Sequence, residues 1–207
     1  MEFLGNINIQ FYLAAYLIGS IPFGLVLVKL FAGIDIREAG SKSIGATNVL
    51  RVVKAHNPDL AKKLGIATLA LDALKGAGII LVGMLAGLAP EVLWTLGLLA
   101  VIGHCFSIFL LFEGGKGVAT GLGVVLVLLP FEALLGLAVW FLMAKTLRIS
   151  SLSSLTGLLA AVAVSYFNHP GLGIGSHAPI LLIAFIIIYK HVPNLIRLVR
   201  KEEQAVV

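Results

Sequence analysis

The stretch Val118–Leu147, VATGLGVVLVLLPFEALLGLAVWFLMAKTL, decides the fold of this chain. It forms either one long bent helix or two short helices that meet at Pro130, because proline lacks the backbone N–H that an uninterrupted helix needs. The first interpretation gives six membrane spans in the whole chain, and the second gives seven. The choice also decides which loops share a side of the membrane.

Apolar runs of roughly one bilayer crossing recur along the chain. On the seven-span interpretation we expect helices at approximately Ile9–Leu30, Leu64–Leu88, Val92–Phe112, Val118–Leu129, Phe131–Thr146, Leu152–Phe167 and Ala178–Tyr189. Pro22 is expected to kink the first of them, and its freed backbone carbonyl to be met by Ser20 or by a neighbouring helix.

The distribution of positive charge favours seven spans. Lys and Arg crowd the segment between the first two spans and the tail, whereas the gaps after spans two, four and six contain none. With seven spans, all 15 Lys and Arg residues except Lys75 lie on one side. Because basic loops remain in the cytoplasm, we predict an all-α polytopic membrane protein with seven transmembrane helices in one bundle. Its N-terminus is then outside and its C-terminus cytoplasmic.

The composition excludes a soluble domain and a disordered chain. Of the 207 residues 59% are hydrophobic and 12% are charged, and the mean hydropathy is +1.06. Soluble domains have about 45–50% apolar and about 25% charged residues. The single cysteine, Cys105, allows no internal disulfide. We expect residues 1–207 to form a single integral-membrane domain.

The segment between the first two spans carries a polar stretch, Gly40–Arg51, with the sequence GSKSIGATNVLR. Hydroxyl side chains and an amide alternate with glycines, and an arginine ends the stretch. Such residues bind clusters of anionic oxygens through backbone N–H groups and charged hydrogen bonds. Composition alone leaves open whether the stretch is a phosphate cradle or a solvated, N-capped cytoplasmic loop.

A second polar stretch on the same side joins spans three and four. It comprises GHCFS at 103–107 and FEGGKGVAT at 112–120. Three glycines around Lys116 would let backbone N–H groups approach a phosphate closely, and the following helix would add its dipole. A flexible turn with one topogenic lysine is the alternative.

The tail contains a third polar stretch, Tyr189–Arg197, with the sequence YKHVPNLIR. His191 and Asn194 are three residues apart and would share one face of a helix, which Pro193 is expected to start. We interpret the basic residues of the tail as anchors at the lipid surface. They are Lys190, Arg197, Arg200 and Lys201.

Two further polar features lie in or next to the spans. Asp72 and Lys75 are spaced i, i+3 in the second span and are expected to pair, which lowers the cost of burying them. Hydroxyls at the entrance of the sixth span either cap that helix or bind an anion. They belong to Ser150, Ser151, Ser153 and Ser154.

Several catalytic arrangements are absent from the sequence. None of the five histidines is followed by aspartate five residues later, and no Gly-x-Ser-x-Gly motif occurs. Cysteine and histidine also lack the spacing of metal ligands. We therefore expect no hydrolase-type serine nucleophile, no metal and no other cofactor.

In joint register, the three polar stretches resemble the motifs of the PlsY family, the bacterial acyl-phosphate:glycerol-3-phosphate acyltransferases. GSIPFG at 19–24, Asp72-x-x-Lys75-Gly76 and SLSS at 151–154 are also similar to that family's pattern. Two positions depart from it. Ser43 stands where we expect asparagine, and Ser107 stands where we expect proline.

The resemblance implies transfer of a long-chain acyl group from acyl phosphate to the sn-1 hydroxyl of glycerol 3-phosphate, giving lysophosphatidic acid and phosphate. It implies a multi-pass protein of the bacterial inner membrane with a cytoplasmic active site, in contact with membrane lipid but with no nucleic acid and no obligatory protein partner. The residues assigned to catalysis are Ser41, Arg51, Lys116, His191 and Asn194. Those assigned to substrate binding are Gly40, Gly45, Thr47, Asn48, Gly103, His104, Gly114, Gly115, Gly117, Ser153 and Ser154.

The chemistry is consistent with these assignments. Acyl phosphate is an activated mixed anhydride, so positioning and charge neutralisation would supply most of the catalysis. The hydroxyl proton would pass to a substrate phosphate oxygen or to His191, and the sequence leaves both open. The alternative function is a small transporter or scramblase of an anionic solute, with Asp72 and Lys75 as its coupling pair. A purely structural membrane subunit would leave the three polar stretches unexplained.

Overall fold

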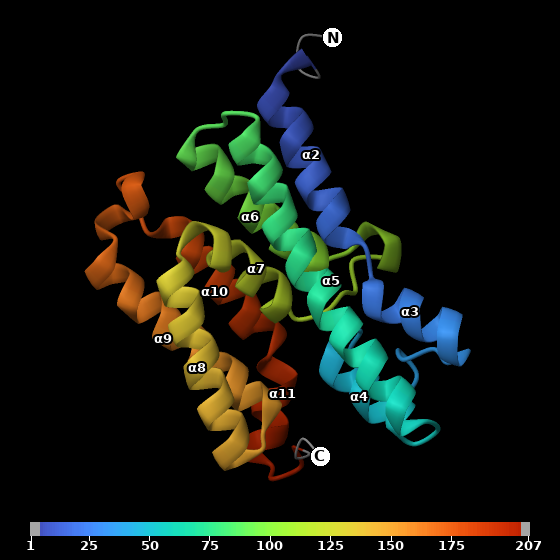
Figure 1. Cartoon of the computed structure of the whole chain (residues 1–207). Helices are drawn as coiled ribbons and strands as arrows, with labels where there is room; N and C mark the ends of the chain where they lie inside the picture. Colours follow the sequence, from blue (N-terminus) through green and yellow to red (C-terminus); the bar gives the residue numbers. More distant parts are fainter. Residues whose placement is uncertain (1–4, 204–207) are drawn as a thin grey trace.

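Every apolar run predicted as a span is helical over most of its length in the structure, a computed structural model that describes residues 5–203 (Figure 1). Within those residues the chain forms α-helices and two 3₁₀ turns, and no strand. The helices are α2 (Ile7–Ser20), α3 (Phe23–Ala32), α4 (Ala46–Lys54), α5 (Pro58–Leu85), α6 (Pro90–Cys105), α7 (Val118–Leu128), α8 (Pro130–Leu147), α9 (Ser150–Asn168), α10 (Ala178–Lys190) and α11 (Val192–Val199). The 3₁₀ turns are η1 (Ile108–Leu110) and η2 (Pro170–Gly173).

The predicted break at Pro130 is confirmed. Leu129 ends α7 and precedes α8 with φ −141° and ψ 69°, so the two helices are separate. Five helical segments in the described range are long and apolar enough to cross a membrane, and α10 with α11, bent by 50°, makes a sixth. α7 has only 11 residues, fewer than a bilayer crossing needs. It lies inside the bundle, where Gly123 packs so closely that a Cβ would overlap the backbone oxygen of Ala73 on α5.

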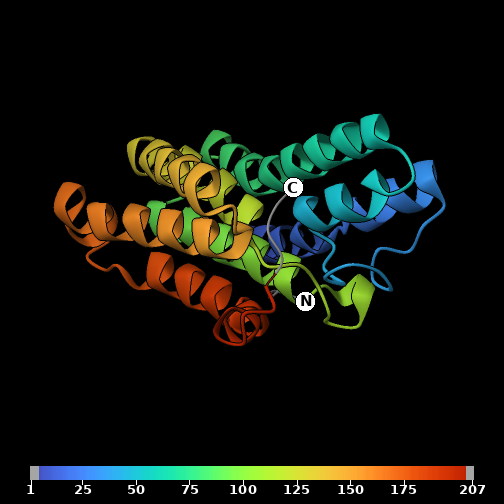
Figure 2. The ribbon, with the colours of Figure 1, turned by 90° about the horizontal axis from the view of Figure 1, so that it is seen from below.

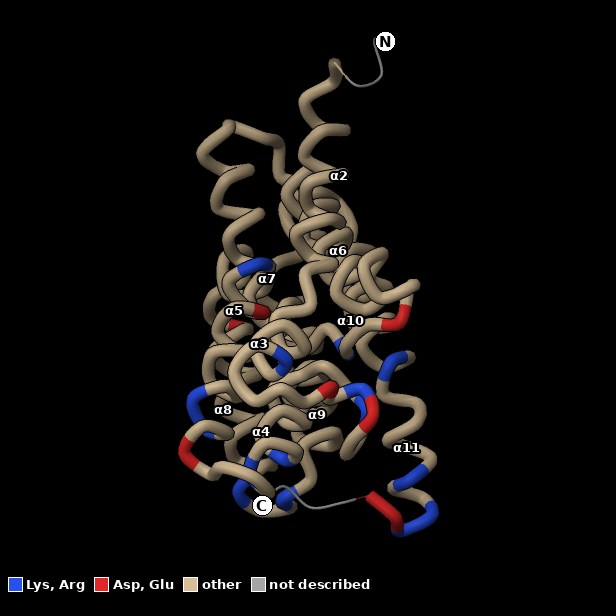
Figure 3. Tube along the Cα trace, turned by 90° about the vertical axis from the view of Figure 1, so that its right-hand side faces the viewer, with Lys and Arg blue, Asp and Glu red and all other residues tan. Residues whose placement is uncertain are grey.

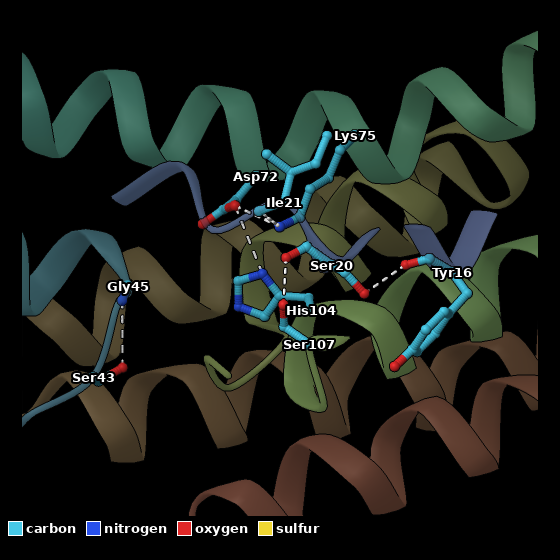
Figure 4. Close-up of polar contacts among 9 residues, drawn as sticks. All are labelled: Tyr16, Ser20, Ile21, Ser43, Gly45, Asp72, Lys75, His104 and Ser107. Carbon is cyan, nitrogen blue, oxygen red and sulfur yellow. Dashed lines mark hydrogen bonds and ion pairs between the residues drawn. The ribbon is translucent and has the colours of Figure 1, made fainter. Parts of the chain in front are cut away.

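The first predicted span is broken into α2 and α3 at Pro22, which cannot continue the hydrogen bonds of a helix. Backbone oxygens near the break find partners on other segments (Figure 4). Ser107 Oγ donates to Ser20 O at 2.6 Å, and Lys75 Nζ donates to Ile21 O at 2.8 Å. The Ser20 hydroxyl donates back into α2. The expected compensation therefore comes from neighbouring segments, and it includes Ser107, one of the two departures from the family pattern.

Asp72 and Lys75 form the predicted pair in the middle of α5. Lys75 Nζ lies 2.8 Å from Asp72 Oδ1, and both side chains are almost completely buried. The ammonium group therefore has two oxygen partners, the carboxylate and the backbone oxygen of Ile21. A buried charge that is both paired and hydrogen-bonded is the arrangement that the bundle interior tolerates.

Positive charge is concentrated at one end of the bundle. The α5–α6 turn, the α7–α8 turn and the η2 connection contain no Lys or Arg, and they lie in the upper half of Figure 1. The blue Lys and Arg positions of Figure 3 gather toward the other end, around α4 and α11. The candidate site lies at this basic end.

The polar stretch after the first span contains a helix, which the sequence analysis treated as part of a loop. In α4, Val49, Val52 and Val53 form a buried apolar side. This side packs in a cluster with Val28 of α3 and Leu64 of α5. The packing fixes the helix beside the bundle, and with it the direction in which Thr47 and Arg51 project. At the other side of the molecule α9 lies between α8 and α10 (Figure 2).

Candidate active site

A cavity at the basic end brings together all five residues predicted to be catalytic. Its wall includes Ser41, Arg51, Lys116, His191 and Asn194, which come from the three polar stretches. From there the cavity continues between α7, α8, α9 and α10, where its wall is mainly apolar. One compartment thus joins a polar, cationic end to an apolar interior.

Three helices point their N-termini at the polar end. The wall includes Ala46 and Thr47 of α4, Val118 and Ala119 of α7, and Ser150 and Ser151 of α9, which are the first two residues of each helix. None of the three helices has a side-chain hydrogen bond that caps its N-terminus. Free N–H groups and the positive ends of three helix dipoles therefore converge on one place, which favours an anion.

The serines before the sixth predicted span do not cap α9, so the capping alternative is wrong. The N-cap is Ile149, and Ser153 Oγ donates to its backbone oxygen at 2.8 Å. The Ser150 hydroxyl lies 3.1 Å from the Thr47 hydroxyl and links α9 to α4 across the cavity. Ser154 lines the wall, whereas Ser153 is buried behind it.

Asn48 holds the first polar stretch in shape. Its Nδ2 donates to the backbone oxygens of Ser43 at 2.8 Å and Ile36 at 3.1 Å, and its Oδ1 accepts from the backbone N–H of Ser41 at 2.8 Å. Gly40 has φ +61°, and a Cβ there would overlap Asn48 Oδ1. Asn48 and Gly40, both predicted to bind substrate, therefore shape the loop. Ser43, one of the departures from the family pattern, contributes its backbone oxygen to this arrangement, and its hydroxyl accepts from the backbone N–H of Gly45 at 3.4 Å (Figure 4).

Gly114 and Gly115 of the second stretch pack against the end of α6. Their backbone N–H groups are therefore not free to bind a phosphate. Gly114 N donates to Cys105 O at 3.2 Å, and Gly115 N donates to His104 O at 2.9 Å. A Cβ on Gly115 would overlap the His104 ring. Only Gly117, with φ +81° at the start of α7, lines the cavity. The expectation that this whole loop wraps a phosphate is corrected to one glycine and the N-terminus of α7.

Five residues predicted to bind substrate do not lie on the cavity wall. Close packing with neighbouring segments explains why their side chains are small, or why their hydroxyl is already hydrogen-bonded. They are Gly40, Gly103, Gly114, Gly115 and Ser153. Gly103 packs against α2, where a Cβ would overlap Tyr16 O. The other six are on the wall: Gly45, Thr47, Asn48, His104, Gly117 and Ser154.

Arg51 and Lys116 are the cations that the cavity leaves available. Among the described residues, neither side chain makes a direct hydrogen bond or salt bridge. Burial lowers the pKa of Lys116 to about 8, with the nearby charges of Arg197 and Arg51 acting in the same direction and Glu203 against it. A bound anion would reverse this loss by supplying the missing countercharge.

The third polar stretch turns at His191, between α10 and α11, and Pro193 lies in the first turn of α11, as predicted. His191 Nδ1 lies 2.7 Å from Ile187 O. Because a carbonyl oxygen only accepts, Nδ1 carries the hydrogen and Nε2 is the basic nitrogen of the neutral ring. Asn194 donates through Nδ2 and leaves its buried Oδ1 without a partner among the described residues.

Glu203, which the sequence analysis did not assign, anchors the tail in the site. Its Oε1 accepts from Asn194 Nδ2 at 2.6 Å and from Ser151 Oγ at 3.1 Å, and its Oε2 accepts from Arg197 Nε at 2.8 Å. Partial burial raises the pKa of this carboxyl, but the hydrogen bonds from Asn194 and Arg197 outweigh it and keep the pKa below its ordinary value. Arg197, predicted to be a lipid-surface anchor, is therefore engaged by a carboxylate. No local pattern identified this contact.

Asp72 of α5 and His104 of the second polar stretch both lie on the cavity wall, and Figure 4 shows them side by side. His104 Nδ1 is 3.6 Å from Asp72 Oδ1, and Lys75 holds the same carboxylate oxygen. His104 thus faces the carboxylate on one side and Gly115 on the other. This places the loop before α7 relative to α5.

The whole chain is similar to known proteins. The family model described as glycerol-3-phosphate acyltransferase matches residues 9–201. Curated proteins named glycerol-3-phosphate acyltransferase from Aliarcobacter butzleri and Sulfurimonas denitrificans are 63% and 57% identical over 207 residues, which is 100% of each chain.

Two solved structures share the fold. A crystal structure of PlsY, an integral membrane glycerol 3-phosphate acyltransferase in its glycerol 3-phosphate form, has a TM-score of 0.86 and 35% identity, and the match covers 97% of this chain and 96% of that one. The lysophosphatidic acid form of PlsY has a TM-score of 0.85 and 36% identity over 97% and 95% of the two chains. The helix order, the three polar stretches and these similarities agree, and the chain belongs to the PlsY family of integral membrane glycerol-3-phosphate acyltransferases.

Proposed function

We propose that this protein transfers a fatty acyl group from acyl phosphate to the sn-1 hydroxyl of glycerol 3-phosphate, giving lysophosphatidic acid and phosphate. One observation carries the proposal. Three uncapped helix N-termini and two cations without a partner among the described residues converge at one end of a cavity whose remaining wall is mainly apolar. Both substrates have a phosphate for the polar end, and the donor has an alkyl chain for the apolar interior. The two similar PlsY structures are described as the forms with the acceptor and with the product of such a reaction.

Each part of the polar end has a role in this proposal. Arg51 and the N-terminus of α4 hold one phosphate, and Lys116 with the N-terminus of α7 holds the other. The Ser41 and Thr47 hydroxyls add hydrogen bonds to phosphate oxygens. Asn194 Oδ1, which lacks a partner, accepts a hydrogen bond from a hydroxyl of the glycerol. These contacts bring the acceptor oxygen to the acyl carbon.

The transfer itself is a single displacement. The sn-1 oxygen attacks the acyl carbonyl carbon, a C–O ester bond forms, and the bond from that carbon to the phosphate oxygen breaks. Phosphate leaves with the electron pair, and the hydroxyl proton goes to a phosphate oxygen or to His191 Nε2. Because the donor is already activated, no residue of the chain needs to act as nucleophile, and the convergent dipoles stabilise the charge that develops.

The proposal also places the protein. The chain lies in the bacterial inner membrane in seven spans, with its basic end in the cytoplasm, where water-soluble glycerol 3-phosphate reaches the site. Its surroundings are membrane lipid. The reaction needs no cofactor, no nucleic acid and no obligatory protein partner.

Phosphate release by the purified protein tests the function directly. Release should require both acyl phosphate and glycerol 3-phosphate, a dependence that a solute transporter would not show. An acceptor without the sn-1 hydroxyl should give no product, and acyl-CoA should replace acyl phosphate poorly, since its thioester lacks the compact phosphoryl group. Lys116→Ala serves as the inactive control. Equal turnover with acyl-CoA would contradict the proposed donor.

A further inference from the structure

The cavity has a defined length from its polar end to its apolar interior end. Along α9 its wall runs from Ser150, the first residue of the helix, to Val162. At a rise of about 1.5 Å per residue this interval is about 18 Å. The walls formed by α7, α8 and α10 extend to Val125, Ala133 and Ile180, respectively. Each of the four helices therefore contributes one wall residue at the interior end.

The interior end is closed by one packed cluster. Val125, Ala133, Val162 and Ile180 are all buried, and all four belong to the same apolar cluster. The cluster also contains buried side chains that are not on the cavity wall, among them Trp94 of α6, Leu129 between α7 and α8, and Leu172 of η2. These side chains pack together with the four wall residues. The cavity is therefore blind at this end.

A buried polar group next to this end makes the stop firm. Glu132 precedes Ala133 in the first turn of α8 and has no exposed surface. Its Oε1 accepts from Asn168 Nδ2 at 2.8 Å and lies 3.3 Å from His169 Nε2, and its Oε2 has no hydrogen-bond partner among the described residues. These contacts join the first turn of α8, which carries Ala133, to the end of α9 and the residue after it.

We propose that Ala133 and Val162 determine how long an acyl chain this protein accepts. The inference rests on the proposed use of an acyl phosphate, and it adds the substrate's chain length. With the phosphate at the polar end, an extended alkyl chain advances about 1.25 Å per carbon, since each C–C bond of about 1.5 Å is inclined in a zigzag. The cavity is about 18 Å long and the phosphate occupies part of it, so it holds at most about 14 carbons in extended form. Longer chains have to bend or leave their last carbons outside the apolar wall.

Two substitutions at the blind end should change chain preference in opposite directions. Ala133→Leu fills the end of the cavity and should lower kcat/KM for 16-carbon acyl phosphate by roughly tenfold or more, while a 10-carbon donor is used normally, because one or two misplaced methylenes change specificity by this much. Val162→Ala removes two methyl groups there and should raise the relative kcat/KM for 16- and 18-carbon donors.

The experiment measures kcat/KM for a series of acyl phosphates from 10 to 18 carbons with the purified full chain. The matched control is Ala138→Leu, which makes the same change at an exposed position of α8 away from the cavity. It should leave the profile unchanged. Active variants at positions 133 and 162 that both keep the wild-type profile would overturn the inference and leave the proposed function standing. Absence of turnover with every chain length in the wild-type protein would instead contradict the proposed function. If Ala133→Leu does not fold, the direction of the change in Val162→Ala decides.

Discussion

Asn194 Nδ2 donates a 2.6 Å hydrogen bond to Glu203 Oε1, and this contact joins α11 to the tail that follows it. The same carboxylate binds Arg197 of α11 and Ser151 of α9. Asn194 therefore cannot rotate without breaking a charged hydrogen bond. Its Oδ1, which has no partner among residues 5–203, is thereby held in one position, where the proposed mechanism needs an acceptor for the glycerol hydroxyl.

Removing this anchor should impair catalysis. Glu203→Ala frees Asn194 and leaves Arg197 without its partner, so we expect kcat/KM for glycerol 3-phosphate to fall by roughly a hundredfold, as expected for misplacement of a positioning group by about 1 Å. Glu203→Gln keeps an oxygen acceptor and should lose less. The control is Glu202→Gln, which neutralises an exposed neighbouring carboxylate. If Glu202→Gln lowered kcat/KM as much as Glu203→Ala, the negative charge of the tail, and not the hydrogen bonds of Glu203, would be responsible for the loss.

Arg51 should require its guanidinium and not merely a positive charge. Arg51→Ala should raise KM or abolish turnover, and Arg51→Lys should fail to restore the lost function, because an ammonium group cannot form the bidentate contact. Steady-state kinetics with glycerol 3-phosphate and acyl phosphate varied in turn would show which substrate suffers. Lys54→Ala removes an exposed charge from the same helix and should behave as wild type. Normal kinetics in Arg51→Ala would mean that the cradle is misassigned.

The pH dependence of catalysis should report on Lys116. Its pKa of about 8 means that the ammonium form predominates at pH 7 and is lost as the pH rises through 8. The kcat/KM for phosphate substrates should therefore decline above about pH 8. The corresponding decline in kcat should occur at a higher pH than the decline in kcat/KM, because bound phosphate stabilises the charged form of Lys116.

Lys116→Arg provides the control for this profile. Arginine stays protonated throughout the accessible range, so the alkaline limb should disappear even if overall activity is lower. A limb that stays at the same pH in this variant would assign the titration to another group.

Direct transfer predicts that no acyl-enzyme accumulates. Cys105, the single thiol, is completely buried against Gly117, and Ser41 has no base within hydrogen-bonding distance in the described part of the chain. Protein mixed with acyl phosphate alone should keep its mass in intact-protein mass spectrometry, and Cys105→Ser should retain activity. An acyl adduct that forms and decays at the turnover rate would establish a two-step mechanism.

The proposed topology can be tested by thiol labelling in a Cys105→Ser background. A cysteine at Ser176, in the connection between α9 and α10, should react with an impermeant reagent added outside intact cells. A cysteine at Glu202 should react only after the membrane is permeabilised. The nearby position Gln204 lies outside the described residues. The opposite labelling pattern would reverse the orientation of the bundle.

The sequence alone was sufficient for the apolar helices of the bundle and for the grouping of the three polar stretches, but it did not reveal α4. Apolar runs predict the helices of the bundle because apolar side chains are driven out of water at any place in the chain. Pro22, Pro130 and Pro193 mark breaks because proline lacks a backbone N–H. The alternation of charged and uncharged gaps separated two helices from one at Pro130. These signals are local, so they can be read from the sequence without knowledge of the tertiary structure.

Only the tertiary structure decided which polar groups remain free to bind a ligand. The N–H groups of Gly114 and Gly115 looked available, yet α6 occupies both. Asn48 looked like a substrate ligand, yet its amide is used to hold its own loop. Glu203 gave no signal, and its partners lie on α9 and α11. A hydrogen-bonding group can bind a substrate only if no other part of the chain satisfies it, and that depends on contacts between segments distant in sequence. The sequence shows which donors and acceptors are present, whereas packing determines which of them remain free to bind a substrate.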